Sequence, residues 1–207
     1  MNNQVNLFAS STLPSESFSL EALRRGDKSE FTQVVEAFSP RLYRLALKML
    51  SNPQDAEDVL QETFLKAFRA IDRFDGRSSL STWLYRIATN EALMKLRKKN
   101  PEFISIEEPY TEVEDPDQEP LQIVDWCCIP ESELMNEEAM AELDRAVENL
   151  PASLRLAFLL RDIEHLSTRE AAEVLEVSET ALKTRLSRAR LRLRQSLSTY
   201  FSERMEA

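Results

Sequence analysis

Apolar residues recur every three or four positions along most of this chain, and that spacing predicts helices. A short first helix is expected from Phe18 to Arg25, ending at Gly26. Asp27 then begins the longest helix, with Glu30 placed to complete a capping box. The apolar stripe of this helix consists of Phe31, Val34, Val35, Phe38, Leu42, Leu45, Met49 and Leu50. Pro40 lies inside the stripe and predicts a kink or a break.

Two more helices are expected before residue 100. The dipeptide Asn52-Pro53 is a typical helix start, and the helix should run to about Arg73. Its core-facing positions are Ala56, Val59, Leu60, Ala67, Phe68 and Ile71. A loop around Gly76 follows, and then a helix from about Leu80 to Lys99. Because the sequence has only two glycines and no useful alternating strand pattern, the predicted fold class is all-α.

A second, mostly polar face runs along the helix that begins at Pro53. It consists of Asp55, Asp58, Gln61, Glu62 and Leu65. Acids in a first turn stabilise the helix dipole, which explains Asp55 and Asp58 without any function. That explanation does not cover Gln61, Glu62 and Leu65, which continue the same face and suggest a partner surface. The residues alone leave both interpretations open.

Aromatic rings and cations are interleaved around the loop at Gly76. The rings are Phe74, Trp83 and Tyr85, and the cations are Arg73, Arg77 and Arg86. This mixture suits unstacked bases and single strands, although Phe74 and Trp83 are also ordinary core residues. The run Arg97-Lys98-Lys99 at the end of the following helix would serve a phosphate backbone.

The segment from Leu166 to Arg194 predicts two helices joined by a tight turn. Ser167 and Glu170 form a capping box for the first helix, and Ser178 caps the second. One face of the second helix is basic and carries Lys183, Arg185, Arg188, Arg190, Arg192 and Arg194. A short helix, a tight turn and a basic helix are typical of a DNA-reading helix-turn-helix. A hairpin with a solvated charged face is the alternative, but such faces usually mix both signs.

Charge is distributed unevenly along the 207 residues, whose net charge is −10. Residues 102–144 hold 15 of the 36 acids and no lysine or arginine, which leaves 21 acids against 26 bases elsewhere. Five prolines between residues 101 and 130 indicate an extended, flexible acidic linker. The expected organisation is a loose tail (1–17), a helical domain (18–100), the linker (101–130) and a helix-turn-helix domain (131–202). Helices at about 133–149 and 151–163 are expected to support the helix-turn-helix.

The reactive side chains in the sequence do not form a pattern that is typical of an enzyme. The sequence offers no nucleophile–base pair, carboxylate dyad, phosphate loop or metal-ligand spacing, so no cofactor, metal or small-molecule substrate is expected. Cys127 and Cys128 are adjacent and cannot form an ordinary bridge with each other, which leaves a redox-sensing role as a minor alternative. His165 is expected to be structural. Without a secretory signal or a membrane-spanning stretch, the expected location is the cytoplasm.

The whole arrangement resembles the extracytoplasmic-function (ECF) sigma factors of the bacterial sigma-70 family. The resemblance covers residues 22 to 100 and 135 to 198, and the matching text includes DAEDVLQETFLKAFRAIDRF, STWLYRIATNEALMKLRKK and LSTREAAEVLEVSETALKTRLSRARLRLR. It implies a transcription initiation factor whose first domain (sigma region 2) binds core RNA polymerase and opens the promoter −10 element. The second domain (sigma region 4) would read the −35 element in the major groove. Two matching modules in this order are more specific than a lone helix-turn-helix.

The resemblance assigns roles to particular residues. The polymerase clamp helices would contact Asp55, Asp58, Gln61, Glu62 and Leu65. The −10 DNA would contact Phe74, Arg77, Ser79, Arg86, Asn90, Arg97 and Lys98. The −35 DNA would contact Ser178, Thr180, Lys183, Thr184, Arg185 and Arg188.

The resemblance also implies partners and shows departures. The polymerase flap is an expected partner, as is an anti-sigma factor, in this family often membrane-anchored, and the linker would thread the polymerase cleft. The factor would be associated with the nucleoid when bound to polymerase. Glu176 stands where such turns often have glycine, and a residue there at positive φ would be strained. Met94 stands where the family commonly has aspartate, which affects the details of −10 recognition.

Two rival interpretations follow from the same residues. An operator-binding regulator would use the terminal motif without polymerase, but it leaves the Asp55–Leu65 face unexplained. An all-α interaction protein would use its basic face only for solubility.

Overall fold

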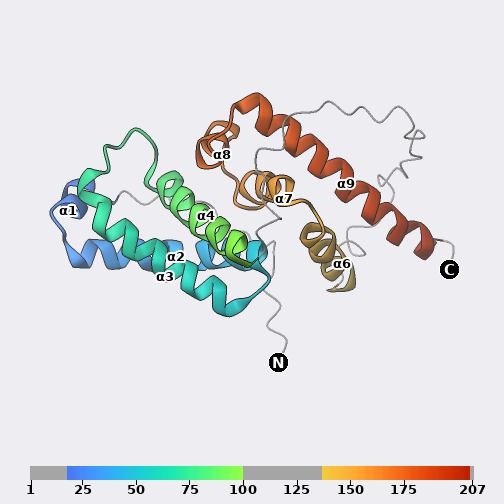
Figure 1. The fold of residues 1–207 in the computed structure, drawn as a ribbon, viewed down its shortest axis with the longest axis horizontal. Helices are drawn as coiled ribbons and strands as arrows, with labels where there is room; N and C mark the ends of the chain where they lie inside the picture. Colours follow the sequence, from blue (N-terminus) through green and yellow to red (C-terminus); the bar gives the residue numbers. More distant parts are fainter. Residues whose placement is uncertain (1–17, 100–136, 206–207) are drawn as a thin grey trace.

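The computed structural model describes residues 18–99 and 137–205, and these contain helices without any strand (Figure 1). The first domain comprises α1 (Leu20–Arg24), α2 (Lys28–Leu50), α3 (Pro53–Ala70), a 3-10 turn (Ile71–Arg73) and α4 (Leu80–Lys99). The second comprises α6 (Glu137–Glu148), α7 (Ala152–Phe158), a π-helical turn (Leu159–Ile163), α8 (Thr168–Val174) and α9 (Glu179–Met205). The predicted all-α class with two helical domains is confirmed. The expected tail, the linker and the Trp126-Cys127-Cys128 segment lie outside the described residues.

The start of α2 differs from the expected capping box. The Asp27 side chain accepts hydrogen bonds from the backbone N–H groups of Ser29 and Glu30, as predicted for a cap. The Glu30 carboxylate, however, accepts from the backbone N–H of Ser19 at 2.6 Å instead of returning to Asp27. Glu30 therefore ties α1 to α2, because the N–H before a helix is another donor that needs a partner.

Of the kink or break predicted at Pro40, the break is absent, since α2 continues through Pro40 to Leu50. Proline removes the hydrogen bond to the carbonyl four residues earlier, which here belongs to Glu36. Glu36 and Pro40 both lie on the exposed side of α2, where water can bond that carbonyl. Phe38 and Leu42 are buried on the opposite side and hold the helix against the core.

The core of the first domain is formed where α2, α3 and α4 pack on one another. Leu42, Val59 and Leu84 are almost completely buried there. The expectation that Phe68 joins this core is wrong, because 41% of its surface is exposed. Its ring packs on that of Phe31 at the rim, with centroids 5.0 Å apart. The neighbouring Ala67 is fully buried and takes the inward-facing position instead.

The second domain surrounds the helix-turn-helix. The capping box of α8 is formed as predicted: Ser167 Oγ accepts from the Glu170 N–H, and the Glu170 carboxylate accepts from the Ser167 N–H. Ser178 caps α9 by accepting from the Ala181 N–H. Glu176, in the turn between these helices, has a positive φ of 54°, a conformation that is strained for a residue other than glycine.

The two domains are in direct contact. Helix α4 packs on α8, and α2 packs on α7, so the helix-turn-helix lies beside the first domain (Figure 1). The structure therefore describes the two domains packed against each other, within residues 18–99 and 137–205.

Candidate functional site

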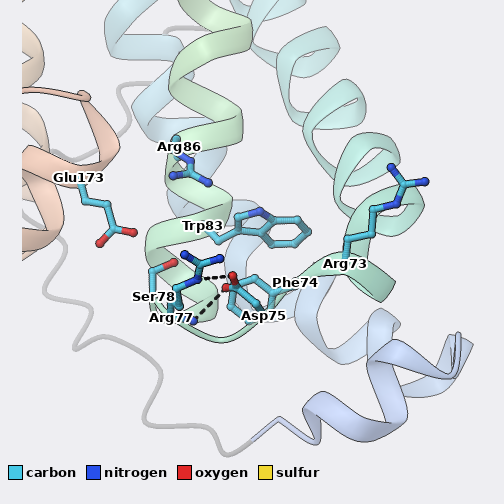
Figure 2. Close-up of a pocket in the computed structure, with 8 residues that line it drawn as sticks. All are labelled: Arg73, Phe74, Asp75, Arg77, Ser78, Trp83, Arg86 and Glu173. Carbon is cyan, nitrogen blue, oxygen red and sulfur yellow. Dashed lines mark hydrogen bonds and ion pairs between the residues drawn. The ribbon is translucent and has the colours of Figure 1, made fainter.

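A pocket lies between the loop that follows the 3-10 turn and the start of α4 (Figure 2). Its lining combines three guanidinium groups, two aromatic rings and polar side chains: Arg73, Phe74, Asp75, Arg77, Ser78, Trp83, Arg86 and Glu173. The Phe74 and Trp83 rings are 5.0 Å apart between centroids and tilted by 36°. Rings beside cations can hold an unstacked base and its phosphate.

Local contacts give the pocket loop a defined shape. Gly76 has a φ of 78°, a conformation that glycine adopts without strain. Asp75 accepts a hydrogen bond from the Arg77 backbone N–H at 3.1 Å, and this bond together with the Arg77 guanidinium holds the pKa of Asp75 below its usual value. The Arg24 guanidinium donates to the carbonyl of Phe74 at 2.6 and 3.0 Å. The loop is thus fastened both internally and to α1.

The candidate −10 residues are only partly brought together. Phe74, Arg77 and Arg86 line the pocket, and Phe74 is 95% buried, so its ring forms a wall and not a free platform. Ser79 follows the lining residue Ser78 in the chain and caps α4 by accepting from the Thr82 N–H. Further along α4, the remaining candidates are exposed, namely Asn90, Arg97 and Lys98.

The pocket also contains residues that were not chosen as −10 candidates. Arg73 and Trp83 belong to the mixture of rings and cations around Gly76, and this pattern in the sequence could have identified them. Ser78 follows from the same loop. Glu173 comes from α8 in the second domain, and no local pattern predicts its position here.

The predicted polymerase-binding face on α3 is divided in two. Lys95 Nζ on α4 lies 3.2 Å from Asp55 Oδ1 and 2.7 Å from Asp58 Oδ2, and Lys99 also pairs with Asp55. Hydrogen bonds from Lys99 and Lys95 hold the pKa of Asp55 below its usual value. The rest of the face is exposed and consists of Gln61, Glu62 and Leu65.

An exposed apolar area extends this second part of the face. Leu65 is 47% exposed, and Phe68, which was assigned to the core from its spacing, is 41% exposed one turn further along. Two large apolar side chains on one exposed helix surface are a common feature of protein-binding sites.

The candidate −35 residues begin at the first turn of α9. Ser178, Thr180, Lys183 and Arg188 are exposed, whereas Thr184 and Arg185 are half-buried. Burial lowers the pKa of Arg185 from its usual value. Of the wider basic face, Arg190 binds Asp162 with nitrogen–oxygen distances of 2.7 and 2.9 Å, so part of that face is used within the domain.

The described residues contain no cluster of three or more potential metal ligands and no helix long and apolar enough to cross a membrane. A helical domain with a cationic aromatic pocket, joined to a basic helix-turn-helix domain, defines the class of two-domain nucleic-acid-binding proteins.

Comparison with known proteins identifies the family. Residues 34–102 match Sigma-70 region 2, and residues 140–193 match Sigma-70 region 4. The chain is 34% identical over 182 residues to the ECF RNA polymerase sigma factor SigW of Bacillus subtilis, covering 86% of this chain and 94% of SigW. It is 32% identical to the RNA polymerase sigma-H factor of Pseudomonas aeruginosa, covering 89% of this chain and 94% of that protein.

A solved structure agrees with this match. The sigma factor RpoE of Bartonella quintana, in complex with the anti-sigma factor NepR, is 26% identical and has a TM-score of 0.59, covering 82% of this chain and 97% of that one. The chain belongs to the ECF sigma factors of the sigma-70 family. Its regions 2 and 4 are the promoter-recognition domains of a transcription initiation factor.

Proposed function

We propose that this sigma factor divides its work among three surfaces: α3 binds core RNA polymerase, the pocket of Figure 2 captures an unpaired −10 base, and the start of α9 reads the −35 element. The observation that carries the proposal is the pocket itself, where Trp83 and Phe74 lie among Arg73, Arg77 and Arg86. Unpairing a base costs a few kcal/mol, so a protein that opens DNA needs such a pocket to hold the base once it is out.

The polymerase surface is centred on the exposed part of α3. Leu65 supplies an apolar contact, Gln61 and Glu62 supply polar ones, and Phe68 extends the apolar area. Asp55 and Asp58 belong to the same surface, but their carboxylates also bind Lys95. Contact with the clamp helices of the largest polymerase subunit therefore depends most on the exposed residues.

The strand that leaves the pocket follows α4. Arg86 lies at the pocket, Asn90 is exposed one turn further along, and Arg97 and Lys98 are exposed at the end of the helix. Ser79 belongs to the same path, and its hydroxyl is hydrogen-bonded to Ser81 and Thr82. Cations placed along one helix position a phosphate backbone, and the pocket supplies the sequence-dependent contact.

The −35 element is read by α9 in the major groove. Its first turns present Thr180, Lys183, Thr184, Arg185 and Arg188, and Ser178 lies at the cap. A lysine or arginine reaching a guanine edge discriminates by about 1–3 kcal/mol. The polymerase flap supports this domain, so that two weak contacts with DNA act together.

The cell context follows from the family. The chain acts in the cytoplasm, at the nucleoid when bound to polymerase, and it has no catalytic activity of its own. An anti-sigma factor is a partner, a proposal supported by the similar RpoE fold solved with NepR.

The domains span 18–100 and 131–202, joined by the acidic linker 101–130 and preceded by a tail, 1–17.

A pull-down with core RNA polymerase tests the proposal against its first rival. The tagged full-length chain should retain core polymerase, and the complex should initiate at a defined promoter. An operator-binding regulator would bind duplex DNA but not polymerase. A protein that never contacts DNA would keep its activity after neutralisation of Lys183 and Arg188.

A further inference from the structure

Two lysines of α4 lie against the acidic part of the predicted polymerase face on α3. Lys95 Nζ bridges the two carboxylates, at 3.2 Å from Asp55 Oδ1 and 2.7 Å from Asp58 Oδ2. Lys99, one turn further along α4, pairs with the other carboxylate oxygen of Asp55. Residues three or four positions apart share one side of a helix, and both the acids and the lysines have this spacing. Two negative and two positive charges therefore meet where α3 and α4 pack on each other.

The acids do not depend on these lysines for their position on α3. The Asp55 backbone N–H donates to Asn52 Oδ1 at 3.0 Å, within the cap that begins the helix. An acid in the first turn of a helix is also stabilised by the helix dipole. Asp58 is carried by the same regular backbone. Removal of the lysines would therefore leave the carboxylates in place and free their oxygens.

The bonds between these acids and lysines are open to competition. The Asp58 and Lys95 side chains are 48% and 26% exposed, and an ion pair at such a surface contributes little because water solvates both charges. A lysine ammonium is a flexible point charge, whereas a guanidinium can donate two parallel hydrogen bonds to one carboxylate. An arginine on a rigid partner surface can therefore displace Lys95 from an aspartate.

A second ion pair between the same helices has the opposite arrangement. Lys66 on α3 pairs with Glu91 on α4, so here the acid belongs to α4. The Glu91 side chain is mostly buried, and the pair engages none of the acids assigned to the polymerase face. The two helices are thus fastened to each other by a contact that leaves the polymerase face unaffected.

Lys99 also departs from the role expected for the basic end of α4. The run Arg97-Lys98-Lys99 suits a phosphate backbone, and Arg97 and Lys98 are exposed. Lys99 instead pairs with Asp55, so the last cation of the run contributes to the α3 side of the domain.

We propose that Lys95 and Lys99 compete with core RNA polymerase for the carboxylates of Asp55 and Asp58, and that they thereby set how tightly region 2 binds. The competing groups on the polymerase are guanidinium groups of the surface that α3 contacts. Each contact with these acids first breaks a bond within region 2, so the net gain from the acids is small. The proposal deepens the polymerase-binding role of α3 given above and rests on it.

Removal of the internal cation tests the competition. Lys95→Gln should strengthen the binding of core polymerase about two- to fivefold, the range that a surface ion pair contributes. Titration of labelled core polymerase with the full-length chain measures the affinity. Glu91→Gln is the matched control, because it removes the other ion pair between α3 and α4, and its affinity should be unchanged. Unchanged or weaker binding by Lys95→Gln, or equal strengthening in both variants, overturns the competition.

The background Asp55→Asn/Asp58→Asn tests where the gain comes from. The charges that Lys95 occupies are absent in this background, so the further change Lys95→Gln should leave the affinity for core polymerase unaltered. A gain as large as in the unsubstituted chain overturns the competition, because it would reflect the loss of a positive charge and not the release of carboxylates.

Leu65→Ser separates the failure of this proposal from the failure of the general one. If Leu65→Ser weakens polymerase binding and Lys95→Gln does not strengthen it, the competition is wrong and the role of α3 stands. If neither Leu65→Ser nor Asp55→Asn/Asp58→Asn changes the affinity, the role of α3 is wrong, and the competition with it. Circular dichroism shows whether Lys95→Gln is folded. If it is not, Lys99→Gln takes its place with the same expected direction, since the Lys99 side chain is half exposed.

Discussion

The Lys95 ammonium on α4 lies 2.7 Å from the carboxylate of Asp58 on α3. This hydrogen bond, with that to Asp55, raises the pKa of Lys95 above its usual value. The acids that begin the predicted polymerase face therefore also fasten two helices of region 2 to each other. Their loss is expected to affect both the domain and its partner, whereas loss of the exposed residues further along α3 is expected to affect the partner alone.

Leu65→Ser should weaken the binding of core RNA polymerase about tenfold, which corresponds to about 1.4 kcal/mol. Because Leu65 is already 47% exposed, its removal should leave the melting temperature almost unchanged. The matched control is Met94→Ser, which removes an apolar side chain of similar exposure from α4. Titration of labelled core polymerase gives both affinities, and an equal loss in the two variants contradicts the assignment of α3.

Arg86→Ala should reduce promoter opening by about ten- to a hundredfold, since a charge-assisted hydrogen bond contributes about 1.5–3 kcal/mol. Permanganate reactivity of unpaired thymines in the polymerase complex measures this effect. Arg25→Ala is the control, because Arg25 is exposed at the C-cap of α1, beside Glu21, and does not line the pocket. Normal opening with Arg86→Ala would remove this residue from the strand path.

Lys183→Ala should make promoter binding by the polymerase complex less dependent on salt. One lost phosphate contact changes the slope of log K against log salt concentration by about 0.9. Arg190→Ala should leave the slope unchanged, because Arg190 is bound to Asp162 within the domain. The prediction fails when the two variants give the same slope.

Glu176→Gly should stabilise the protein by about 0.5–1 kcal/mol, because glycine adopts a positive φ without strain. Glu179→Gly makes the same chemical change in the first turn of α9 and should destabilise by a similar amount. Denaturant unfolding followed by circular dichroism compares the two. A destabilised Glu176→Gly variant would show that the Glu176 side chain makes a contact, and that this contact stabilises the protein more than the backbone strain destabilises it.

The stabilising effect of Glu170 should disappear in acid. Burial alone would raise the pKa of Glu170, but its hydrogen bonds with Ser167 and Thr82 outweigh burial and hold the pKa below the usual value of 4.5. The charged form therefore stabilises the folded state at neutral pH, and this contribution is lost as the pH falls through the lowered pKa. Glu170→Gln should cost less than about 1 kcal/mol at pH 7, because the side chain is partly exposed. Unfolding of both proteins at pH 7 and pH 3 measures the difference, which should be smaller at pH 3.

Local sequence signals predicted the helices well. Ser167 and Ser178 act as caps where expected, and the helix from Leu80 to Lys99 has the expected ends. Hydrogen bonds at a helix start involve residues three apart, so they can be read from a short segment. The break at Pro40 was not found, because burial of Phe38 and Leu42 outweighs the one lost hydrogen bond.

Long-range contacts could not be predicted in this way. The sequence showed that aromatic and basic residues are close together around Phe74, and the structure gathers several of them in one pocket. It did not show that Glu164 lies between Arg41 and Tyr85, which are 123 and 79 residues away. That contact depends on which faces of two separate domains meet. The roles of the chosen residues in polymerase and DNA binding remain predictions.

The most direct measurement of the central claim is run-off transcription with core RNA polymerase from the same organism on a library of its genomic DNA. The full-length chain should direct initiation to a limited set of start sites that share −10 and −35 sequences, and core polymerase alone should give none of them. Identical transcripts with and without the chain would contradict the account.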